Sequence, residues 1–197
     1  MSVHNDKIKN PGIFFITFTC FDWLPLIEIT KSYDLFYKWF ELLESKGHCI
    51  NAYTIMPNHV HLIMWFNGGL LPLHKVIGNG KRFMAYAIIK RLKQMGSNKL
   101  LNYLAHAVRS SDRNKGQKHE IWQDSCDIKE CRTEKFILQK LIYIHCNPCR
   151  GRWKLAKSII DYPHSSAAFY ISGKHGHFKV RDYRDFLGYY DDSSENE

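Results

Sequence analysis

The sequence predicts an α+β fold that is built on one antiparallel sheet. Segments rich in β-branched and aromatic residues alternate with segments of helical periodicity, and no internal repeat or linker divides the chain. The expected strands cover residues 13–20, 48–55, 58–66 and 120–123, and the expected helices cover residues 32–46, 73–95 and 133–145. This β-α-β-β-α-β-α order is that of a ferredoxin-like (RRM-like) sandwich, an antiparallel sheet with helices packed on one face, followed here by a C-terminal helical and loop extension.

The elements of the first half have clear boundaries. The first strand follows Pro11-Gly12 and consists almost entirely of β-branched and aromatic residues, as expected of a central strand. The first helix starts after Ser32, a suitable N-cap, and stops at Gly47. The next two strands are joined by residues 56–58, which read Met-Pro-Asn, so we expect them to form a pair.

The helix expected at residues 73–95 is less regular. Its apolar face is predicted at Phe83, Tyr86, Ile89 and Leu92. Residues 78–80 read Gly-Asn-Gly, which predicts either an early break in this helix or a late start.

The last helix, expected at residues 133–145, has two stripes of side chains. An apolar stripe at i, i+4 and i+7 is predicted to face the core. Lys140, Tyr143 and Asn147 form a second stripe at i, i+3 and i+7 on a different face. Pro148 ends the helix, because a proline disfavours helical geometry at the residue before it.

Composition indicates one basic, globular domain. The chain has 197 residues, of which 45% are hydrophobic and 14% aromatic. We expect a single domain over residues 1–190, with a core at 12–150 and an extension at 151–190, and then a disordered acidic tail at 191–197. The formal net charge is +9 although that tail is acidic, which indicates a polyanionic partner, most simply nucleic acid.

The sequence gives no sign of a membrane or secreted protein. No apolar run approaches the roughly 20 residues of a membrane span. Residues 1–10 are polar and lack the apolar core of a signal peptide. We therefore expect a cytoplasmic protein whose six cysteines are mostly thiols.

Residues 51–66 contain the most informative pattern of the chain. His59 and His61 open the second strand of the predicted pair, and side chains at i and i+2 of a strand point to the same face. The two imidazoles should therefore lie side by side, as a preformed pair of nitrogen ligands for a divalent metal. An isolated His-x-His is more often a pair of surface histidines, but here an apolar run follows and places the rings at the mouth of a buried strand.

A histidine pair on a sheet and a tyrosine on a helix favour one reaction. A tyrosine oxygen can attack a DNA phosphodiester when a divalent metal polarises the phosphate, and the product is a covalent phosphotyrosine. Asn147, one turn after Tyr143, could add an oxygen ligand from the same helix face. Taken alone, one of eleven tyrosines on a helix is more often a packing residue.

Two segments resemble a known family. Residues 56–63 (Met-Pro-Asn-His-Val-His-Leu-Ile) are similar to the HUH motif of single-tyrosine transposases. Residues 143–150 (Tyr-Ile-His-Cys-Asn-Pro-Cys-Arg) resemble the tyrosine-helix motif of their REP-associated branch, the REP-associated tyrosine transposases. Trp122-Gln123 and residues 161–167 are similar to flanking segments of that branch, so the resemblance extends from about residue 12 to residue 173.

The resemblance implies an enzyme that cleaves and rejoins single-stranded DNA next to REP-like hairpins. It implies that Tyr143 is the nucleophile and that His59, His61 and Asn147 are metal ligands. The products would be a 5′-phosphotyrosine and a free 3′-hydroxyl, and the cofactor would be Mg²⁺ or Mn²⁺. A monomer is favoured over a homodimer, because the REP-associated branch tends to be monomeric and the long C-terminal segment could cover a dimerisation surface.

Three positions depart from the pattern of the branch. Cys149 stands where a small aliphatic residue is expected, and His164 replaces an expected aromatic residue. Cys131 stands where the branch often has arginine, which puts one phosphate contact in doubt. None of the three removes a catalytic group.

Basic side chains occur in clusters along the second half of the chain and are expected to bind DNA phosphates. The candidates are Lys81, Arg82, Lys90, Arg91, Arg109, Arg113, Lys140, Arg150, Arg152 and Lys154.

The alternative is a non-catalytic nucleic-acid-binding protein of ferredoxin-like fold. Such a protein would bind bases by aromatic stacking on the sheet and would form no covalent intermediate. It could include a structural zinc site, in which Cys146 and Cys149 are joined by Cys126 and Cys131 or by the two histidines.

Overall fold

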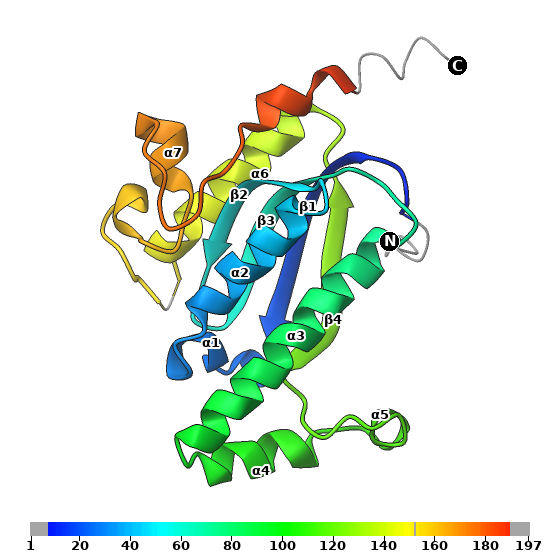
Figure 1. Cartoon of the computed structure of the whole chain (residues 1–197). Coiled ribbons are helices and arrows are strands. Elements are labelled where there is room, and N and C mark those ends of the chain that lie inside the picture. Colours follow the sequence, from blue (N-terminus) through cyan, green and yellow to red (C-terminus); the bar gives the residue numbers. More distant parts are fainter. Residues whose placement is uncertain (1–7, 152, 190–197) are drawn as a thin grey trace.

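The computed structural model describes residues 8–151 and 153–189. Its centre is a four-stranded sheet in the order β2-β3-β1-β4, and the pairs β2·β3, β3·β1 and β1·β4 are all antiparallel (Figure 1). The strands are β1 (Gly12–Cys20), β2 (Cys49–Ile55), β3 (His59–Phe66) and β4 (Trp122–Glu130). This is the ferredoxin-like strand order, so the predicted fold class is confirmed.

Two helices cover one face of the sheet. They are α2 (Tyr33–Glu44) and α3 (Leu73–Gln94), which lie in front of the strands in Figure 1. Phe36 of α2 and Met84 of α3 are fully buried in one core cluster with Phe18 of β1 and Leu62 of β3. Because strand side chains alternate between faces, the even-numbered residues of β1 and β3 form this core.

A third helix, α6 (Glu134–Cys146), covers the opposite face. Its buried Ile137, Leu141 and Ile144 form a second core cluster with odd-numbered strand residues such as Phe15 and Ile63. The predicted apolar stripe is therefore confirmed. The prediction that the helices pack on one face holds for α2 and α3 and is wrong for α6, because the pattern of alternating elements does not determine which face an additional helix covers.

The α3 helix differs from its prediction in two respects. It continues through residues 78–80 without a break. Its buried stripe includes Ile77 and Met84, whereas Phe83 and Tyr86, which we predicted to be apolar-face residues, are exposed. The reason is Gly80, where a Cβ would lie 2.4 Å from the indole ring of Trp39, so the helix is closest to the core at a residue without a side chain.

The remaining elements are short or join the main ones. The helix α4 (Asn98–His106) was not predicted. The strand β4 extends seven residues beyond the predicted strand, because its exposed, polar residues hide the strand pattern. The short helices are α1 (Leu26–Ile29), α4 (Asn98–His106), α5 (Ser110–Arg113) and α7 (Ala167–Ser172), and the 3-10 turns are η2 (Phe21–Trp23), η3 (Asn147–Cys149), η4 (Ile159–Asp161) and η5 (Tyr183–Phe186).

The C-terminal extension covers the outer edge of β2. The N–H of Ile55 donates to the carbonyl of His164 at 2.9 Å, and the N–H of Ser166 donates to the carbonyl of Tyr53 at 3.0 Å. Further along, the N–H of Arg181 donates to β2 as well. These bonds satisfy an edge that would otherwise be open to pairing with another chain.

Two predictions fall outside the described residues: the acidic tail at 191–197 and the DNA-binding role of Arg152. Within the residues that the structure describes, no helix is long and apolar enough to cross a membrane.

Candidate active site

His59 and His61 lie side by side on β3, on the face of the sheet that α6 covers. Their ring centroids are 4.7 Å apart, and the ring planes cross at 77°. In the register of the sheet, Thr19 of β1 is opposite His59 and Thr17 is opposite His61. Both rings are buried, so the predicted pair is present and is held within the sheet.

Both histidines are oriented by a hydrogen bond at Nδ1. Asn58 Oδ1 lies 2.7 Å from Nδ1 of His59, and Thr17 Oγ1 lies 2.7 Å from Nδ1 of His61. An amide oxygen only accepts, so Nδ1 of His59 carries the proton and its Nε2 keeps a lone pair. In metal-binding histidines, a hydrogen bond at the ring nitrogen that does not bind the metal fixes the orientation of the ring, and both histidines have such a bond at Nδ1.

Burial keeps both rings neutral. It lowers the pKa of His59 to about 4. Burial also lowers the pKa of His61, and the nearby His59 and Lys140 add to this shift. Neutral imidazole is the form that binds a metal ion, so both rings are ready to act as ligands at neutral pH.

The α6 helix brings Tyr143 and Asn147 to this pair. The helix starts at Thr133, whose hydroxyl accepts a hydrogen bond from a backbone N–H of the first turn. The Tyr143 ring centroid lies 5.0 Å from that of His61, and the Asn147 amide Nδ2 lies 2.9 Å from Nε2 of His61. The structure therefore assembles all four predicted catalytic and metal-binding residues in one place.

The hydrogen bond of Asn147 determines the tautomer of His61. An amide nitrogen only donates, so Nε2 of His61 accepts from Asn147 and Nδ1–H donates to Thr17. Nε2 thus has its lone pair on the side of α6. Two imidazole nitrogens and one amide oxygen form a donor set that suits a divalent cation, and three protein ligands leave positions for substrate oxygens.

Lys140 and Phe15 complete the surroundings of the tyrosine. The Nζ atom of Lys140 lies 4.7 Å from the Phe15 ring centroid and 5.9 Å from that of Tyr143. Phe15 stacks on His61, with centroids 5.9 Å apart and planes at 17°, and contacts Tyr143 edge-on. Tyr143 itself is 48% exposed, so a substrate can reach it while its neighbours are fixed.

The cysteines do not form a zinc site in the described structure. All six are free, and no group of three His, Cys, Asp or Glu side chains in residues 8–151 and 153–189 is placed to hold a metal ion. A structural zinc site needs four such ligands. The alternative reading of Cys146 and Cys149 therefore has no ligand set in this part of the chain.

The structure shows how two of the three departures pack. Cys131 is fully buried in the core under α6, so it cannot contact a phosphate as an exposed arginine would. His164 stacks on Tyr33 with centroids 3.6 Å apart and planes at 8°, and its Nδ1 lies 2.8 Å from the hydroxyl of Tyr37. The histidine thus packs as the expected aromatic residue would.

Two of the predicted DNA-binding residues are engaged within the fold. Lys81 is half-buried and donates to the carbonyl of Gln123 at 3.1 Å, and burial lowers its pKa. Arg91 donates to the Asp34 carboxylate at 2.8 Å and to the carbonyl of Lys31 at 2.7 Å. These contacts favour structural roles for both residues.

Arg109 and Arg113 also have partners inside the protein. Arg109 forms ion pairs with Asp124 and, at 3.4 Å, with Asp112. Arg113 donates to the carbonyl of Val108 at 3.2 Å. Both hold the segment between α4 and β4 in place, and a role in DNA binding stays a prediction.

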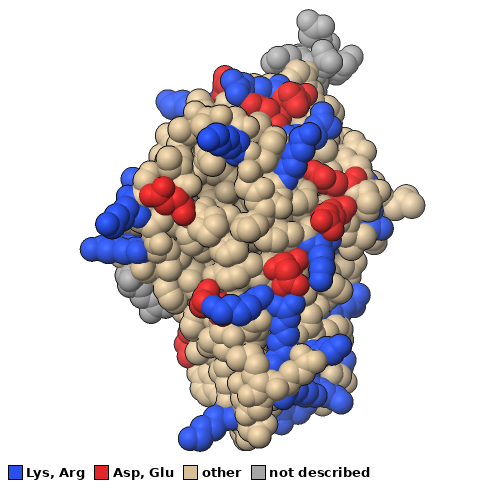
Figure 2. Space-filling view, turned by 60° about the vertical axis from the view of Figure 1, so that its left-hand side comes forward, with Lys and Arg blue, Asp and Glu red and all other residues tan. Residues whose placement is uncertain are grey.

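The other predicted basic residues are better placed for a phosphate. Arg82, Lys90, Arg150 and Lys154 are exposed, and Lys140 lies beside Tyr143. Figure 2 shows a group of Lys and Arg side chains at the lower end of the molecule, where α4 lies, while charges of both signs are scattered over the rest of this face. These residues remain the predicted phosphate contacts.

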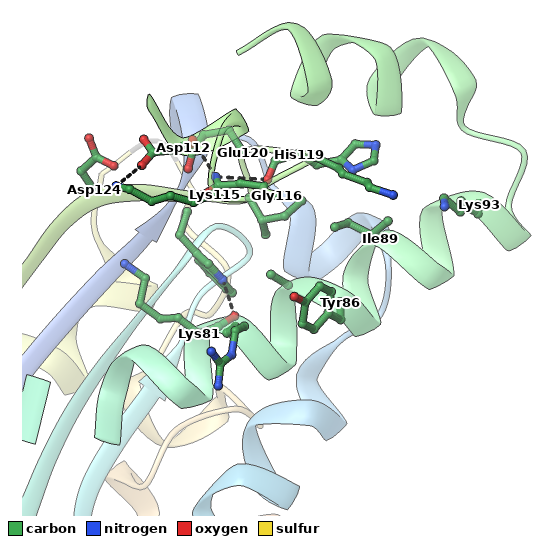
Figure 3. Close-up of a pocket in the computed structure, with 16 residues that line it drawn as sticks. Lys81, Tyr86, Ile89, Lys93, Asp112, Lys115, Gly116, His119, Glu120 and Asp124 are labelled. Atoms are coloured by element: carbon green, nitrogen blue, oxygen red, sulfur yellow. Dashed lines mark hydrogen bonds and ion pairs between the residues drawn. The ribbon is translucent and has the colours of Figure 1, made fainter. Parts of the chain in front are cut away.

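A cavity of about 750 Å³ lies between α3 and residues 112–124 (Figure 3). Lys81, Tyr86 and Lys93 line it from α3, and His119 and other residues line it from the facing segment. It is on the α3 side of the sheet, so it is separate from the histidine pair.

Sequence patterns did not point to the residues that support the site. Thr17 is opposite His61 only because β1 and β3 pair in this register. Asn58 precedes His59 directly, and an amide beside a candidate ligand was the one available signal. Phe15 looked like any other strand residue.

Comparisons with known proteins identify the fold. No protein-family model matches the sequence, and no curated relative matches it. Among solved structures, a REP-associated tyrosine transposase bound to a REP hairpin superposes with a TM-score of 0.61 at 19% sequence identity. The match covers 92% of this chain and 93% of that chain, so the shared fold includes nearly the whole molecule.

Proposed function

We propose that this protein is a single-strand DNA transposase that cleaves and rejoins hairpin-bearing DNA through Tyr143. The main support is the convergence of Tyr143 and Asn147 from α6 on His59 and His61 of β3. The four residues that this chemistry needs lie within a few ångströms of one another. The shared fold with a REP-associated tyrosine transposase is consistent with the proposal.

The metal ligands would be Nε2 of His59, Nε2 of His61 and the side-chain oxygen of Asn147. A bound Mg²⁺ or Mn²⁺ supplies Lewis-acid polarisation of the scissile phosphate. The two histidines are held ready, since Asn58 and Thr17 fix the rings and burial keeps them neutral. Asn147 would have to turn its amide to act as a ligand, because its nitrogen and not its oxygen faces Nε2 of His61.

Tyr143 is the nucleophile in this proposal. Its oxygen attacks the phosphorus, the bond from phosphorus to the 3′-oxygen breaks, and a 5′-phosphotyrosine and a free 3′-hydroxyl result. The phenol proton leaves as the new bond forms, and the departing 3′-oxygen takes up a proton, so the step balances. The ammonium group of Lys140 near the ring favours the developing negative charge.

The proposed partner is single-stranded DNA with a REP-like hairpin. The exposed basic residues Arg82, Lys90, Arg150 and Lys154 would hold phosphates. Each neutralised phosphate releases counterions, so affinity should fall steeply as salt rises. Binding that does not change between low and moderate salt would contradict this part of the proposal.

The site supports a protein that acts as a monomer. Tyr143 and Asn147 reach the histidines of their own chain, so the site does not need a second copy. The C-terminal extension also covers the β2 edge. A stable dimer in sedimentation at low concentration would contradict this expectation.

A cleavage assay on hairpin-bearing single-stranded DNA tests the proposal. Wild-type protein should cut the strand only with Mg²⁺ or Mn²⁺, and chelation should stop the reaction. His59→Ala and His61→Ala should both lose cleavage, with partial recovery for either at high Mn²⁺, while hairpin binding is retained. A protein that binds the hairpin but never cuts it, with any divalent metal, would be the non-catalytic binding module instead.

A further inference from the structure

The turn that follows β1 has an unusual backbone. Asp22 has φ 50° and ψ 31°, and Trp23 has φ 54°. Left-handed geometry is disfavoured for residues with a Cβ, and most of all for bulky ones. Two such residues in succession indicate a turn whose shape is imposed by its surroundings.

Two side chains hold this turn in place. The Tyr103 hydroxyl of α4 donates to the Asp22 carboxylate at 2.8 Å. Asn58 Nδ2 donates to the carbonyl of Trp23 at 3.0 Å, and the Oδ1 atom of the same amide accepts from His59. Asn58 is fully buried, so one rigid amide fixes the turn and the metal-binding histidine relative to each other.

The indole of Trp23 is not used to fill the core. It is 53% exposed, although it is the largest kind of apolar side chain. Its ring centroid lies 6.1 Å from that of His59, with the planes at 72°. A strained backbone therefore holds a half-exposed aromatic ring beside the site, which packing alone does not explain.

We propose that Trp23 is a nucleobase-binding residue, which stacks on the base of a nucleotide next to the phosphate that Tyr143 attacks. This inference rests on the proposed function and adds a substrate contact to it. Every base has a π-face, so an aromatic ring can hold a single strand regardless of its sequence. A phosphate at His59 and His61 brings the base of a neighbouring nucleotide within reach of the indole.

A coupling experiment tests this contact. Wild type, Trp23→Ala and Trp23→Phe are compared on a hairpin oligonucleotide and on copies with one abasic nucleotide, on either side of the cleavage point mapped with wild type. Trp23→Ala should lose about ten-fold or more in kcat/KM on the intact strand, and Trp23→Phe much less. On one of the abasic strands, Trp23→Ala and wild type should be equally slow. The inference would be overturned if Trp23→Ala lowered kcat/KM by the same factor, relative to wild type, on the intact strand and on both abasic strands, or did not lower it at all.

A matched control and a binding measurement complete the test. Tyr86→Ala also removes an exposed aromatic ring, but from α3, so its effect should be the same on intact and abasic strands. In parallel, 2-aminopurine is placed at each single-stranded position in turn and titrated with Tyr143→Phe protein. The 2-aminopurine fluorescence should be quenched at one position, and this quenching should disappear in the double variant Trp23→Ala, Tyr143→Phe. The same fluorescence at every position with and without Trp23 would overturn the inference. The scan needs no cleavage, so it decides on Trp23 even if the proposed reaction fails.

Discussion

Two glycines of α3 should respond to the same substitution in opposite directions. Gly80 is buried against Trp39, and a Cβ there would lie 2.4 Å from two atoms of the indole ring. Trp39 is itself only 2% exposed, so the ring has no free space to move into. Gly78 lies two residues earlier on the same helix and is exposed, with nothing within 4 Å of its Cβ position.

The expected magnitudes follow from these surroundings. Alanine is favoured over glycine within a helix by about 1 kcal/mol, so Gly78→Ala should raise the free energy of unfolding by up to about that amount. Gly80→Ala gains the same helix propensity but overpacks the core, which costs about 1–3 kcal/mol. Since the clash is severe, we expect a net loss of about 1–2 kcal/mol for Gly80→Ala.

Thermal and urea unfolding of the two variants measure this difference. A chain of this size changes its Tm by about 2–4 °C per kcal/mol, so the two variants should differ by about 4–12 °C. Stabilisation by both substitutions would refute the close contact between α3 and α2. Destabilisation by both would show that α3 is interrupted at these residues, as the sequence pattern alone allowed.

Three further predictions concern other parts of the fold. Burial lowers the pKa of His164 to about 4 from its ordinary 6.5, so unfolding takes up a proton and the free energy of unfolding falls as the pH drops from 6.5 to 4. His164→Phe should keep the stacking on Tyr33 and make the free energy of unfolding less dependent on pH in this range. An unchanged slope of stability against pH would contradict the assignment. Arg91→Ala should lower the free energy of unfolding by about 1 kcal/mol, because Asp34 keeps only the longer contact with Lys38 and the carbonyl of Lys31 loses its donor. It should leave the salt dependence of DNA binding unchanged. Thr133→Ala should cost about 1 kcal/mol through the lost N-cap of α6, whereas no change in urea unfolding would show that the cap is dispensable.

Residue spacing predicted each half of the candidate site. His59 and His61 share a face because strand side chains alternate, and Tyr143 and Asn147 share a face because a helix turns every 3.6 residues. These two periods are local properties, so they can be read without knowing the tertiary structure. The meeting of the two pairs depended on how α6 docks, which the resemblance implied and which the structure now shows.

What could not be predicted depends on contacts between distant segments. The buried stripe of α3 passes through Gly80, which offers no apolar side chain to detect. Trp23 looked like one more aromatic residue, because its exposure and its left-handed backbone appear only in three dimensions. The basic residues were found by their charge, but charge does not show whether a side chain such as Arg91 already has a partner.

The most direct test of the proposed function is to find the residue that becomes attached to DNA. Wild-type protein is incubated with hairpin-bearing single-stranded DNA and Mn²⁺, and the covalent adduct is isolated under denaturing conditions and mapped by peptide mass spectrometry. The DNA 5′-phosphate should be found on Tyr143, and Tyr143→Phe should form no adduct while binding the hairpin almost as well as wild type, since it lacks only one hydroxyl. An adduct on another tyrosine, or an adduct that persists in Tyr143→Phe, would contradict the assignment of Tyr143 as the nucleophile.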